Sequence, residues 1–205
     1  MTKEFWNQRY AAVGFAYGEE ANEFLKETLV DIPKGKILFP ADGEGRNGVY
    51  AATLGWQVSS FDLSEEGKKK ALKLASQKNI IQLDYQVGDL KDLSYPEQSF
   101  DAIALIFAHF SGDIKSDYHH LLQKYLKKGG YVIFEAFSKN HLAYNSVNPK
   151  VGGPKDLVTL TSLEEVKDDF KDFEIIRLEE MEVELNEGNY HLGKGAVVRF
   201  IGLKK

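Results

Sequence analysis

From residue 36 onward, short apolar runs alternate with longer stretches in which apolar residues recur at helical spacing. The apolar runs predict buried strands at residues 36–40, 57–61, 83–87, 100–107 and 131–137. Helices are expected between them at residues 46–54, 65–78 and 116–126, with Ser64 as the N-cap of the second. A chain that repeats strand, helix and strand forms a parallel sheet with helices packed on its faces.

The alternation changes after residue 137. Residues 140–156 contain two prolines and predict a long loop, and residues 162–169 predict a short helix that begins with a capping box of Ser162 and Glu165. Two further strands are expected at 173–184 and 196–203, joined by the Gly-rich segment 186–195. Since no helix separates them, they pair antiparallel. The predicted fold class is therefore α/β, a Rossmann-like, seven-stranded, mostly parallel sheet with helices on both faces and an antiparallel final hairpin.

The segment ahead of the first strand predicts two helices, at residues 3–12 and 20–30. Trp6 and Tyr10 are four residues apart, which places them on one helix face, where core packing is the ordinary explanation. Gly14 and Gly18 lie in the connection between the two helices. We expect a single domain over residues 1–205, in which residues 1–34 form a helical lid on a core of residues 35–205.

Composition excludes several classes of site and partner. The chain has no cysteine, which rules out disulfides, a thiol nucleophile and Cys-based metal sites. Its net charge of −5 argues against nucleic acid as a partner, and the basic run Lys68–Lys70 is best interpreted as a solvated helix face. No apolar run has the length of a membrane span, and the first residues lack the pattern of a signal peptide. The sequence thus predicts a cytoplasmic protein that binds neither membrane nor nucleic acid.

The segment Phe39–Gly48, which reads FPADGEGRNG, carries the most chemical information. It joins the first strand to the first helix of the sheet, which is where open parallel sheets bind cofactors. Asp62 follows the second strand, 21 residues after Ala41, and a carboxylate at that position can accept both hydroxyls of a ribose. Asp89 follows the third strand and could receive the exocyclic amine of adenine. Together these strand ends predict a nucleoside site, although each alone is compatible with a turn or a helix cap.

Two cofactor classes fit such a site. Gly43, Gly45 and Gly48 satisfy the G-x-G-x-x-G pattern of dinucleotide-binding folds. Asp42 and Glu44 would place negative charge beside a pyrophosphate, however, and the chain ends in an antiparallel pair instead of a second mononucleotide-binding half. An NAD(P)-dependent oxidoreductase therefore remains an alternative, as does a cofactor-binding protein without catalytic activity.

The order of motifs resembles that of the class I S-adenosylmethionine-dependent methyltransferases, in particular the small tellurite-resistance and thiopurine-type enzymes. The resemblance rests on WNQRY at 6–10, YG at 17–18, GEGRN at 43–47, Asp62, GD at 88–89, LKKGG at 126–130 and EGNYH at 187–191. It departs from the family in the first glycine loop, where Phe39 replaces an acid that orients the methionine end of the cofactor and Ala41 replaces the first glycine. Asp42 is a candidate substitute for that acid.

The resemblance implies S-adenosyl-L-methionine as the cofactor and methyl transfer to a small molecule such as a thiol or a chalcogen oxyanion. The residues that it implies in cofactor binding come from the front segment, the glycine loop and the strand ends. They are Trp6, Arg9, Tyr17, Gly18, Ala41, Asp42, Gly43, Gly45, Arg46, Asn47, Asp62, Leu63, Asp89, Leu90 and Phe107.

We expect histidine side chains to contact the methyl acceptor. His109 follows the fourth strand, beside the expected position of the cofactor sulfur, and is predicted to act as a base or to hold an oxyanion. His191 lies in the Gly-rich connection and is the second catalytic candidate, although a solvated loop would explain it equally well. Further candidates for the acceptor pocket are Glu135, His141, Tyr190 and Arg199. His119 and His120 are expected to be packing or surface residues. No metal is expected, because His109 and His191 lack a recognisable third ligand.

Overall fold

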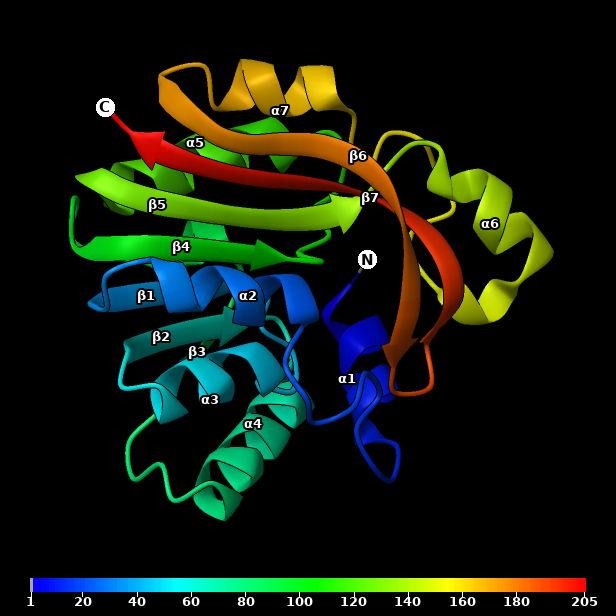
Figure 1. Cartoon of the computed structure of the whole chain (residues 1–205). Coiled ribbons are helices and arrows are strands. Elements are labelled where there is room, and N and C mark those ends of the chain that lie inside the picture. The colour runs from blue at the N-terminus through cyan, green and yellow to red at the C-terminus, as the bar shows by residue number, and fades with distance from the viewer. Residues whose placement is uncertain (1) are drawn as a thin grey trace.

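The computed structural model describes residues 2–205, so that Met1 of the predicted lid lies outside the described residues. Within this range one sheet of seven strands has the order β3-β2-β1-β4-β5-β7-β6. The strands are β1 Lys36–Pro40, β2 Gln57–Asp62, β3 Asp84–Val87, β4 Phe100–Ile106, β5 Leu126–Phe137, β6 Phe173–Glu187 and β7 His191–Lys204. Neighbours from β3 to β5 pair parallel, and β7 pairs antiparallel with β5 and β6. The predicted α/β fold with a final antiparallel hairpin is confirmed (Figure 1).

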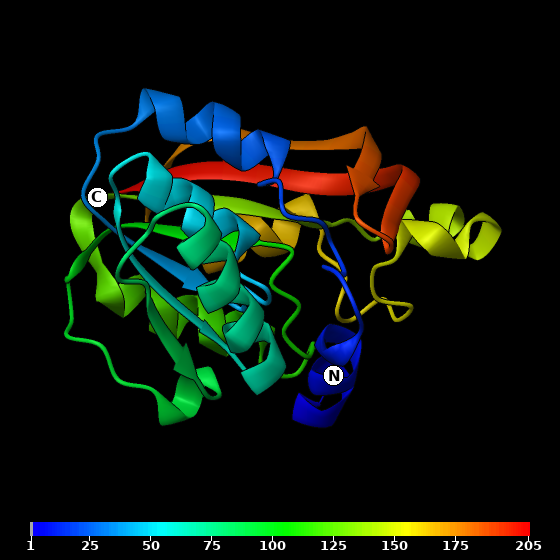
Figure 2. The same ribbon diagram turned by 90° about the horizontal axis from the view of Figure 1, so that it is seen from below.

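Helices cover both faces of the sheet. They are α1 Lys3–Ala11, α2 Glu23–Asp31, α3 Arg46–Thr53, α4 Glu65–Gln77, α5 Lys115–Tyr125, α6 His141–Val147 and α7 Leu163–Asp169, with short 3₁₀ turns at Leu90–Asp92 and Pro149–Val151. Figure 2 shows α2 and α7 on opposite sides of the sheet. The apolar residues of α2 and α3 pack on one face with Ile37 and Phe39, and those of α5 and α7 pack on the other with Leu38 and Ile103. Side chains of successive strand residues point to opposite faces, which is why neighbours in β1 contribute to different cores.

Two helix starts predicted from the sequence are confirmed. The hydroxyl of Ser64 accepts a hydrogen bond from the N–H of Gly67 at the start of α4. At the start of α7, Ser162 and Glu165 form the predicted capping box, in which each side chain accepts the backbone N–H of the other. Such caps satisfy N–H groups that have no partner within the first turn of a helix.

The predicted long loop at 140–156 contains structure instead. Helix α6 occupies residues 141–147, and its first residue, His141, is completely buried and stacks on Phe137 with 3.9 Å between the ring centroids. The prolines at 149 and 154 follow the helix, so they end it without interrupting it. The expectation of a structureless loop was wrong because burial of His141 stabilises a helix that the composition of the segment does not favour.

The predicted connection at 186–195 is also corrected. Strand β6 continues to Glu187 and β7 begins at His191, so that residues 188–190 alone form the turn. Its glycines serve close packing: a Cβ at Gly195 would lie 3.1 Å from the ring of His141, and one at Gly193 would lie 2.7 Å from Asn148. The long hairpin bends over the end of the sheet (Figure 1), and it places His191 in a strand.

A smaller correction concerns residues 127–130, which lie between the helix predicted at 116–126 and the strand predicted at 131–137. They belong to β5, and the pairing with β4 shifts there, from Phe100 opposite Leu126 to Ala102 opposite Tyr131. Gly129 has a φ of +73°, which accommodates the extra residues in a bulge.

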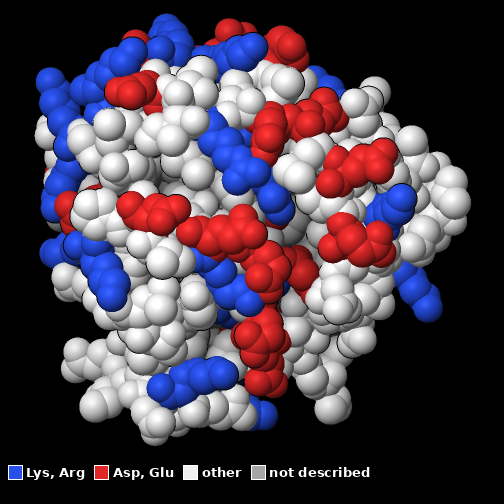
Figure 3. Space-filling model, viewed as in Figure 1, with Lys and Arg blue, Asp and Glu red and all other residues white. Residues whose placement is uncertain are grey.

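Strand β6 forms one edge of the sheet, since it pairs with β7 alone. Exposed Glu180, Glu182 and Glu184 alternate along it, and Figure 3 shows acidic side chains along this part of the surface. Charged side chains on an edge strand oppose pairing with a strand of another molecule. The described residues include no helix with the length and apolar character of a membrane span.

Candidate active site

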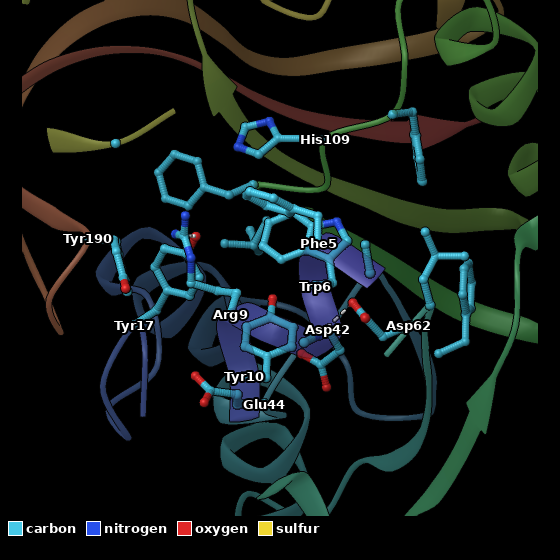
Figure 4. A pocket seen from close by; sticks show the side chains of 18 of the residues that line it. Phe5, Trp6, Arg9, Tyr10, Tyr17, Asp42, Glu44, Asp62, His109 and Tyr190 are labelled. Atoms are coloured by element: carbon cyan, nitrogen blue, oxygen red, sulfur yellow. Dashed lines mark hydrogen bonds between the residues drawn. The ribbon is translucent and has the colours of Figure 1, made fainter. Parts of the chain in front are cut away.

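A cavity of about 450 Å³ lies beyond the carboxyl ends of β1, β2 and β4. Helix α1 and the turn between β6 and β7 lie over it (Figure 4). The strand order changes direction between β1 and β4, since the chain runs outward to β2 and β3 on one side and to β4 and β5 on the other. Open parallel sheets bind ligands beyond the carboxyl ends of the strands at such a point. A volume of this size is in the range of sites for cofactors and small molecules, about 300–1,000 Å³.

The glycine loop forms the floor of the cavity and approaches α1 closely. Ala41, Gly43 and Gly45 all have positive φ, which is strained for alanine and unstrained for glycine. A Cβ at Gly43 would lie 2.5 Å from the hydroxyl oxygen of Tyr10, and one at Gly45 would lie 2.4 Å from the Cβ of Ala71. Gly45, the N-cap of α3, has no side chain to cap that helix, and in the first turn the N–H of Gly48 donates to the carboxylate of Asp42. The remaining first-turn N–H groups of α3 are thus suited to an anionic group of a ligand.

One part of the cavity, which we call the carboxylate end, is lined by Asp42, Glu44, Asp62 and Asp89. Asp62 is 5% exposed, and burial raises the pKa of its carboxyl to about 6, although the N–H groups of Ser64 and Gly43 oppose this increase. These groups donate to its two oxygens at 2.8 and 3.0 Å. Each carboxylate oxygen has a second lone pair, so Asp62 can still accept two hydroxyls.

Asp89 completes the outer side of the carboxylate end. It accepts a hydrogen bond from the hydroxyl of Tyr118 and caps the 3₁₀ turn that begins at Leu90. Leu63 and Leu90 line the cavity next to the two aspartates and provide apolar walls. A carboxylate between apolar walls can bind the amino group of a flat heterocycle, as the sequence predicts for Asp89.

Phe39 shows what the departure from the family pattern does to the structure. Its side chain is 1% exposed, packs in the apolar core with Ile37 and does not line the cavity. Asp42 does line it, and accepts hydrogen bonds from the hydroxyl of Ser60 at 2.8 Å and from the N–H of Gly48 at 3.4 Å. Burial raises the pKa of the Asp42 carboxyl to about 7, an effect that these hydrogen bonds reduce. The end of β1 therefore contributes no acid, and the carboxylate nearest to it in sequence is Asp42.

Glu44 attaches the front segment to the glycine loop. It is 5% exposed and accepts the N–H of Ala16 at 2.7 Å and the Nζ of Lys70 at 2.8 Å. Lys70 also donates to the carbonyl oxygen of Ala12 at 2.8 Å. Because its lone pairs already serve these contacts, Glu44 holds the connection between α1 and α2 against the floor of the cavity.

An aromatic roof closes the cavity from the side of α1. Trp6 and Tyr10 stack with 5.4 Å between their ring centroids, as expected for one helix face. The guanidinium of Arg9 donates to the hydroxyl of Tyr17 at 3.1 Å and lies 3.8 Å from the centre of the Tyr190 ring. Stacking of a guanidinium on an aromatic ring is favourable by about 0.5–2 kcal/mol. Arg9 thus connects α1 to the hairpin turn across the cavity (Figure 4).

The second helix of the predicted lid has another position. Phe24, Leu25 and Leu29 of α2 are buried in the core against the sheet. Among the described residues of the predicted lid, only those of α1 and of the connection after it line the cavity. That these residues move as a lid stays a prediction.

The opposite part of the cavity, which we call the imidazole end, is lined by Phe107, His109 and His191. Phe107 follows β4 with a φ of +51°, in a region that few non-glycine residues adopt. His109 stacks on Phe137 with 5.7 Å between the ring centroids, and its ring nitrogens make no hydrogen bond within residues 2–205. Burial lowers the pKa of His109 to about 3, and the imidazoles of His191 and His141 contribute to this shift. The ring is neutral near pH 7, which argues against the predicted role of holding an oxyanion.

His191 has a different environment. It is 4% exposed, and its Nδ1 lies 2.8 Å from a carboxylate oxygen of Glu187. The guanidinium of Arg46 contacts the same oxygen at 2.8 Å. Asn22 donates to the other oxygen of Glu187 at 3.2 Å and to Glu135 at 2.7 Å. The predicted alternative of a solvated loop histidine is therefore wrong, because β7 begins at His191 and buries it.

Most of the predicted site residues come together around this one cavity. Of the residues predicted to bind the cofactor or to act in catalysis, all line it except Gly18 and Gly45. A Cβ at Gly18 would lie 3.3 Å from the nitrogen of Gly188, so Gly18 serves contact between the front segment and the hairpin turn. Of the further acceptor candidates, Tyr190 lines the cavity, whereas Glu135, His141 and Arg199 do not.

Three other predictions concern histidines and metals. His119 is buried against α7, with its Nδ1 2.6 Å from Asp169, and His120 is exposed, as expected for packing and surface residues. Among the described residues no group of three potential ligands is arranged to hold a metal ion.

The sequence did not single out Asn22 as part of the site, and it marked Glu187 only as the first residue of the EGNYH motif. Glu187 had a signal, since it lies four residues before His191 and a tight turn separates them. Asn22 had none, because its side-chain contacts with Glu135 and Glu187 join residues more than 100 positions apart.

Comparison with known proteins agrees with this geometry. Residues 37–130 match a methyltransferase domain family. No curated protein is similar enough in sequence to count as a match.

Solved structures resemble nearly the whole chain. One comes from work on the conversion of a disulfide bond into a thioacetal group during echinomycin biosynthesis, with 18% identity, a TM-score of 0.76 and coverage of 99% of this chain and 92% of the other. TehB from Haemophilus influenzae shows 17% identity, a TM-score of 0.70 and coverage of 99% and 67%. Magnesium protoporphyrin IX methyltransferase from Synechocystis, solved with bound S-adenosylhomocysteine, shows 13% identity, a TM-score of 0.65 and coverage of 99% and 83%. At these identities the likeness shows a shared fold.

Proposed function

We propose that this chain, which is a class I S-adenosylmethionine-dependent methyltransferase, transfers the methyl group of its cofactor to a small-molecule acceptor such as a thiol or a chalcogen oxyanion. The observation that carries the proposal is one cavity of about 450 Å³ with carboxylates at one end and imidazoles at the other. An acceptor must enter this space beneath α1 and the hairpin turn, and a folded macromolecule would not fit there. The apolar and aromatic lining favours a small, partly apolar acceptor.

The residues present fit the cofactor. The glycine loop has three alternate positions with positive φ, at residues 41, 43 and 45, that let backbone approach a ligand, and the first-turn N–H groups of α3 lie beside it. We propose that Asp62 accepts the ribose hydroxyls and that Asp89 accepts the adenine amine, with Leu63 and Leu90 on either side of the base. In the absence of an acid at Phe39, Asp42 is proposed to bind the ammonium group at the methionine end.

The bound cofactor supplies a methyl group on a positively charged sulfur, which is already activated for transfer. The protein therefore has to align the acceptor, exclude water and, where the acceptor carries a proton, remove it. We propose that Trp6, Arg9 and Tyr17 cover the cofactor. Phe107 and the neutral ring of His109 would form the wall against which the acceptor lies, next to His191.

Calorimetry and a turnover assay test the proposal. S-adenosylhomocysteine is expected to bind the whole chain with micromolar or better affinity, and NAD and NADP are expected not to bind. Methyl groups from labelled S-adenosylmethionine should then appear in at least one acceptor of a panel that contains aliphatic thiols, aromatic thiols, selenite and tellurite. Binding without transfer to any acceptor would support a cofactor-binding protein without catalytic activity. Binding of a nicotinamide dinucleotide alone would overturn the proposal.

A further inference from the structure

The pair formed by Glu187 and His191 has the arrangement of an oriented base. The carboxylate of Glu187 accepts the proton of Nδ1, so the lone pair of this neutral imidazole is on Nε2. Within residues 2–205 Nε2 makes no hydrogen bond, and His191 lines the cavity. Because Nε2 has no partner among these residues and is not enclosed by protein atoms, it is available to a group of the acceptor.

Neither of the neighbouring imidazoles shares this arrangement. His109 has no hydrogen-bond partner that would select one tautomer, as described above. In His141 both nitrogens are engaged by backbone, since Nε2 lies 3.0 Å from the carbonyl oxygen of Gly152 and Nδ1 accepts the N–H of Ala196 at 3.3 Å. Among the described imidazoles that line the cavity, His191 alone is oriented by a carboxylate.

Charges around the pair favour a base that is neutral at rest and stabilised once it takes up a proton. Burial would raise the pKa of Glu187, but Arg46 and His191 hold it at about 2, so the group is ionised. Burial lowers the pKa of His191, and Glu187 opposes this effect. The charged and titratable groups that face His191 are Glu187 of β6, Arg46 of α3, Arg9 of α1, Tyr17 of the front segment, His109 after β4 and His141 of α6.

We infer, on the basis of the proposed function, that Glu187 and His191 form a proton-accepting pair and that the acceptor is a small thiol. The base selects among the possible acceptors. A thiol with a pKa of about 8.5 is close enough to an imidazole for proton transfer, whereas an aliphatic hydroxyl is far less acidic. A chalcogen oxyanion already presents a lone pair and needs no base.

The step balances in atoms and charge. The thiol proton moves to Nε2 of His191, while the sulfur lone pair forms the new bond to the methyl carbon. The bond between that carbon and the cofactor sulfur breaks, and its electron pair stays on the sulfur, which becomes a neutral thioether. The imidazolium lies beside the Glu187 carboxylate and returns its proton to solvent before the next cycle. Glu187 acts through His191 and is a positioning residue.

The first test needs no turnover. In ¹⁵N-labelled protein without ligand, imidazole NMR at pH 7.5 should show His191 neutral, with its proton on Nδ1 and none on Nε2. The titration midpoint of His191 should fall in Glu187→Gln, because the negative charge that favours the imidazolium is lost. A proton on Nε2, or an imidazolium at pH 7.5, would overturn the inference without bearing on methyl transfer.

The second test compares thiols of different acidity. At pH 8, His191→Gln should lower kcat by about 10²- to 10⁴-fold for aliphatic thiols that are mostly protonated. The loss should shrink to less than about tenfold for aromatic thiols that are already ionised, because these need no base. Activity of the wild type should fall as the pH decreases through the pKa of His191. In Glu187→Gln this decrease in activity should occur at lower pH.

His141→Gln is the matched control, because it removes a neighbouring buried imidazole whose nitrogens bind backbone. It should lower the midpoint of thermal unfolding and yet keep the wild-type dependence on thiol acidity. An equal loss for all thiols in His191→Gln, with unchanged affinity for S-adenosylhomocysteine, would refute the base while the proposed function stands. Transfer to tellurite or selenite but to no thiol would refute the thiol acceptor and leave methyl transfer intact.

Discussion

Asp42→Asn should make the protein more stable above pH 7 and less able to bind its cofactor. The carboxyl of Asp42 is half-buried in the wall of the cavity, and burial raises its pKa from 3.8 to about 7. Since the folded-state pKa lies above the unfolded one, the folded protein holds a proton that the unfolded chain releases between pH 4 and pH 7. The stability associated with that proton is complete below about pH 4 and is lost as the pH rises to about 7.

The size of the effect follows from the shift. A difference of about 3 pH units corresponds to a ceiling of about 4 kcal/mol of unfolding free energy at pH 8. Solvent that enters the cavity reduces it, and asparagine keeps only one acceptor oxygen for Ser60 and Gly48, which costs about 1 kcal/mol. We therefore expect Asp42→Asn to gain about 1–2 kcal/mol of unfolding free energy at pH 8. At pH 4.5 the difference should be close to zero, because the unfolded carboxyl is already mostly ionised there and the gain only offsets the lost hydrogen bond.

Urea unfolding of the wild type and Asp42→Asn at several pH values between 4.5 and 8.5 measures this difference. Because the chain has no cysteine, thiol oxidation does not disturb the titration. A variant that is less stable at pH 8, or a difference that does not change with pH, would refute the account of a carboxyl destabilised by burial. Calorimetry at pH 8 separates stability from binding: loss of a charge-assisted hydrogen bond to the cofactor ammonium should weaken S-adenosylhomocysteine by about 10- to 150-fold.

Three further outcomes are expected. Asp62→Ala should weaken the binding of S-adenosylhomocysteine by about 2–4 kcal/mol in calorimetry, because two charge-assisted hydrogen bonds to the ribose are lost. An unchanged affinity would contradict the assignment. Gly188→Ala should lower the free energy of unfolding in urea by about 3 kcal/mol, since φ is +58° and a Cβ would lie 2.4 Å from the nitrogen of Gly18. Gly14→Ala should lower it by only about 1 kcal/mol, because φ is +82° but no atom lies near the added Cβ. Amide exchange of residues 3–20 should slow when S-adenosylhomocysteine is added, and equal rates with and without it would show that this segment does not close.

The carboxylate end of the site was predictable from the sequence. Strands of a parallel sheet end at one edge, so residues that directly follow them converge even when they are far apart in the chain. The apolar runs before Ala41, Asp62, Asp89 and Phe107 located those ends within one or two residues. A local pattern was sufficient, because apolar runs predict where each strand ends, and parallel pairing places those ends side by side at one edge of the sheet.

The imidazole end was decided by tertiary structure. His191 lies in a segment whose glycines and asparagines predict a loop, but pairing with β6 extends β7 to this residue, and the bent hairpin carries it over the sheet. The partners of the network to which it belongs, Glu187, Arg46 and Asn22, come from three separate regions of the chain. Sequence periodicity reports which face of an element is apolar, whereas the orientation of a buried imidazole depends on which charged group lies within hydrogen-bond distance, and only the packing of these regions determines that distance.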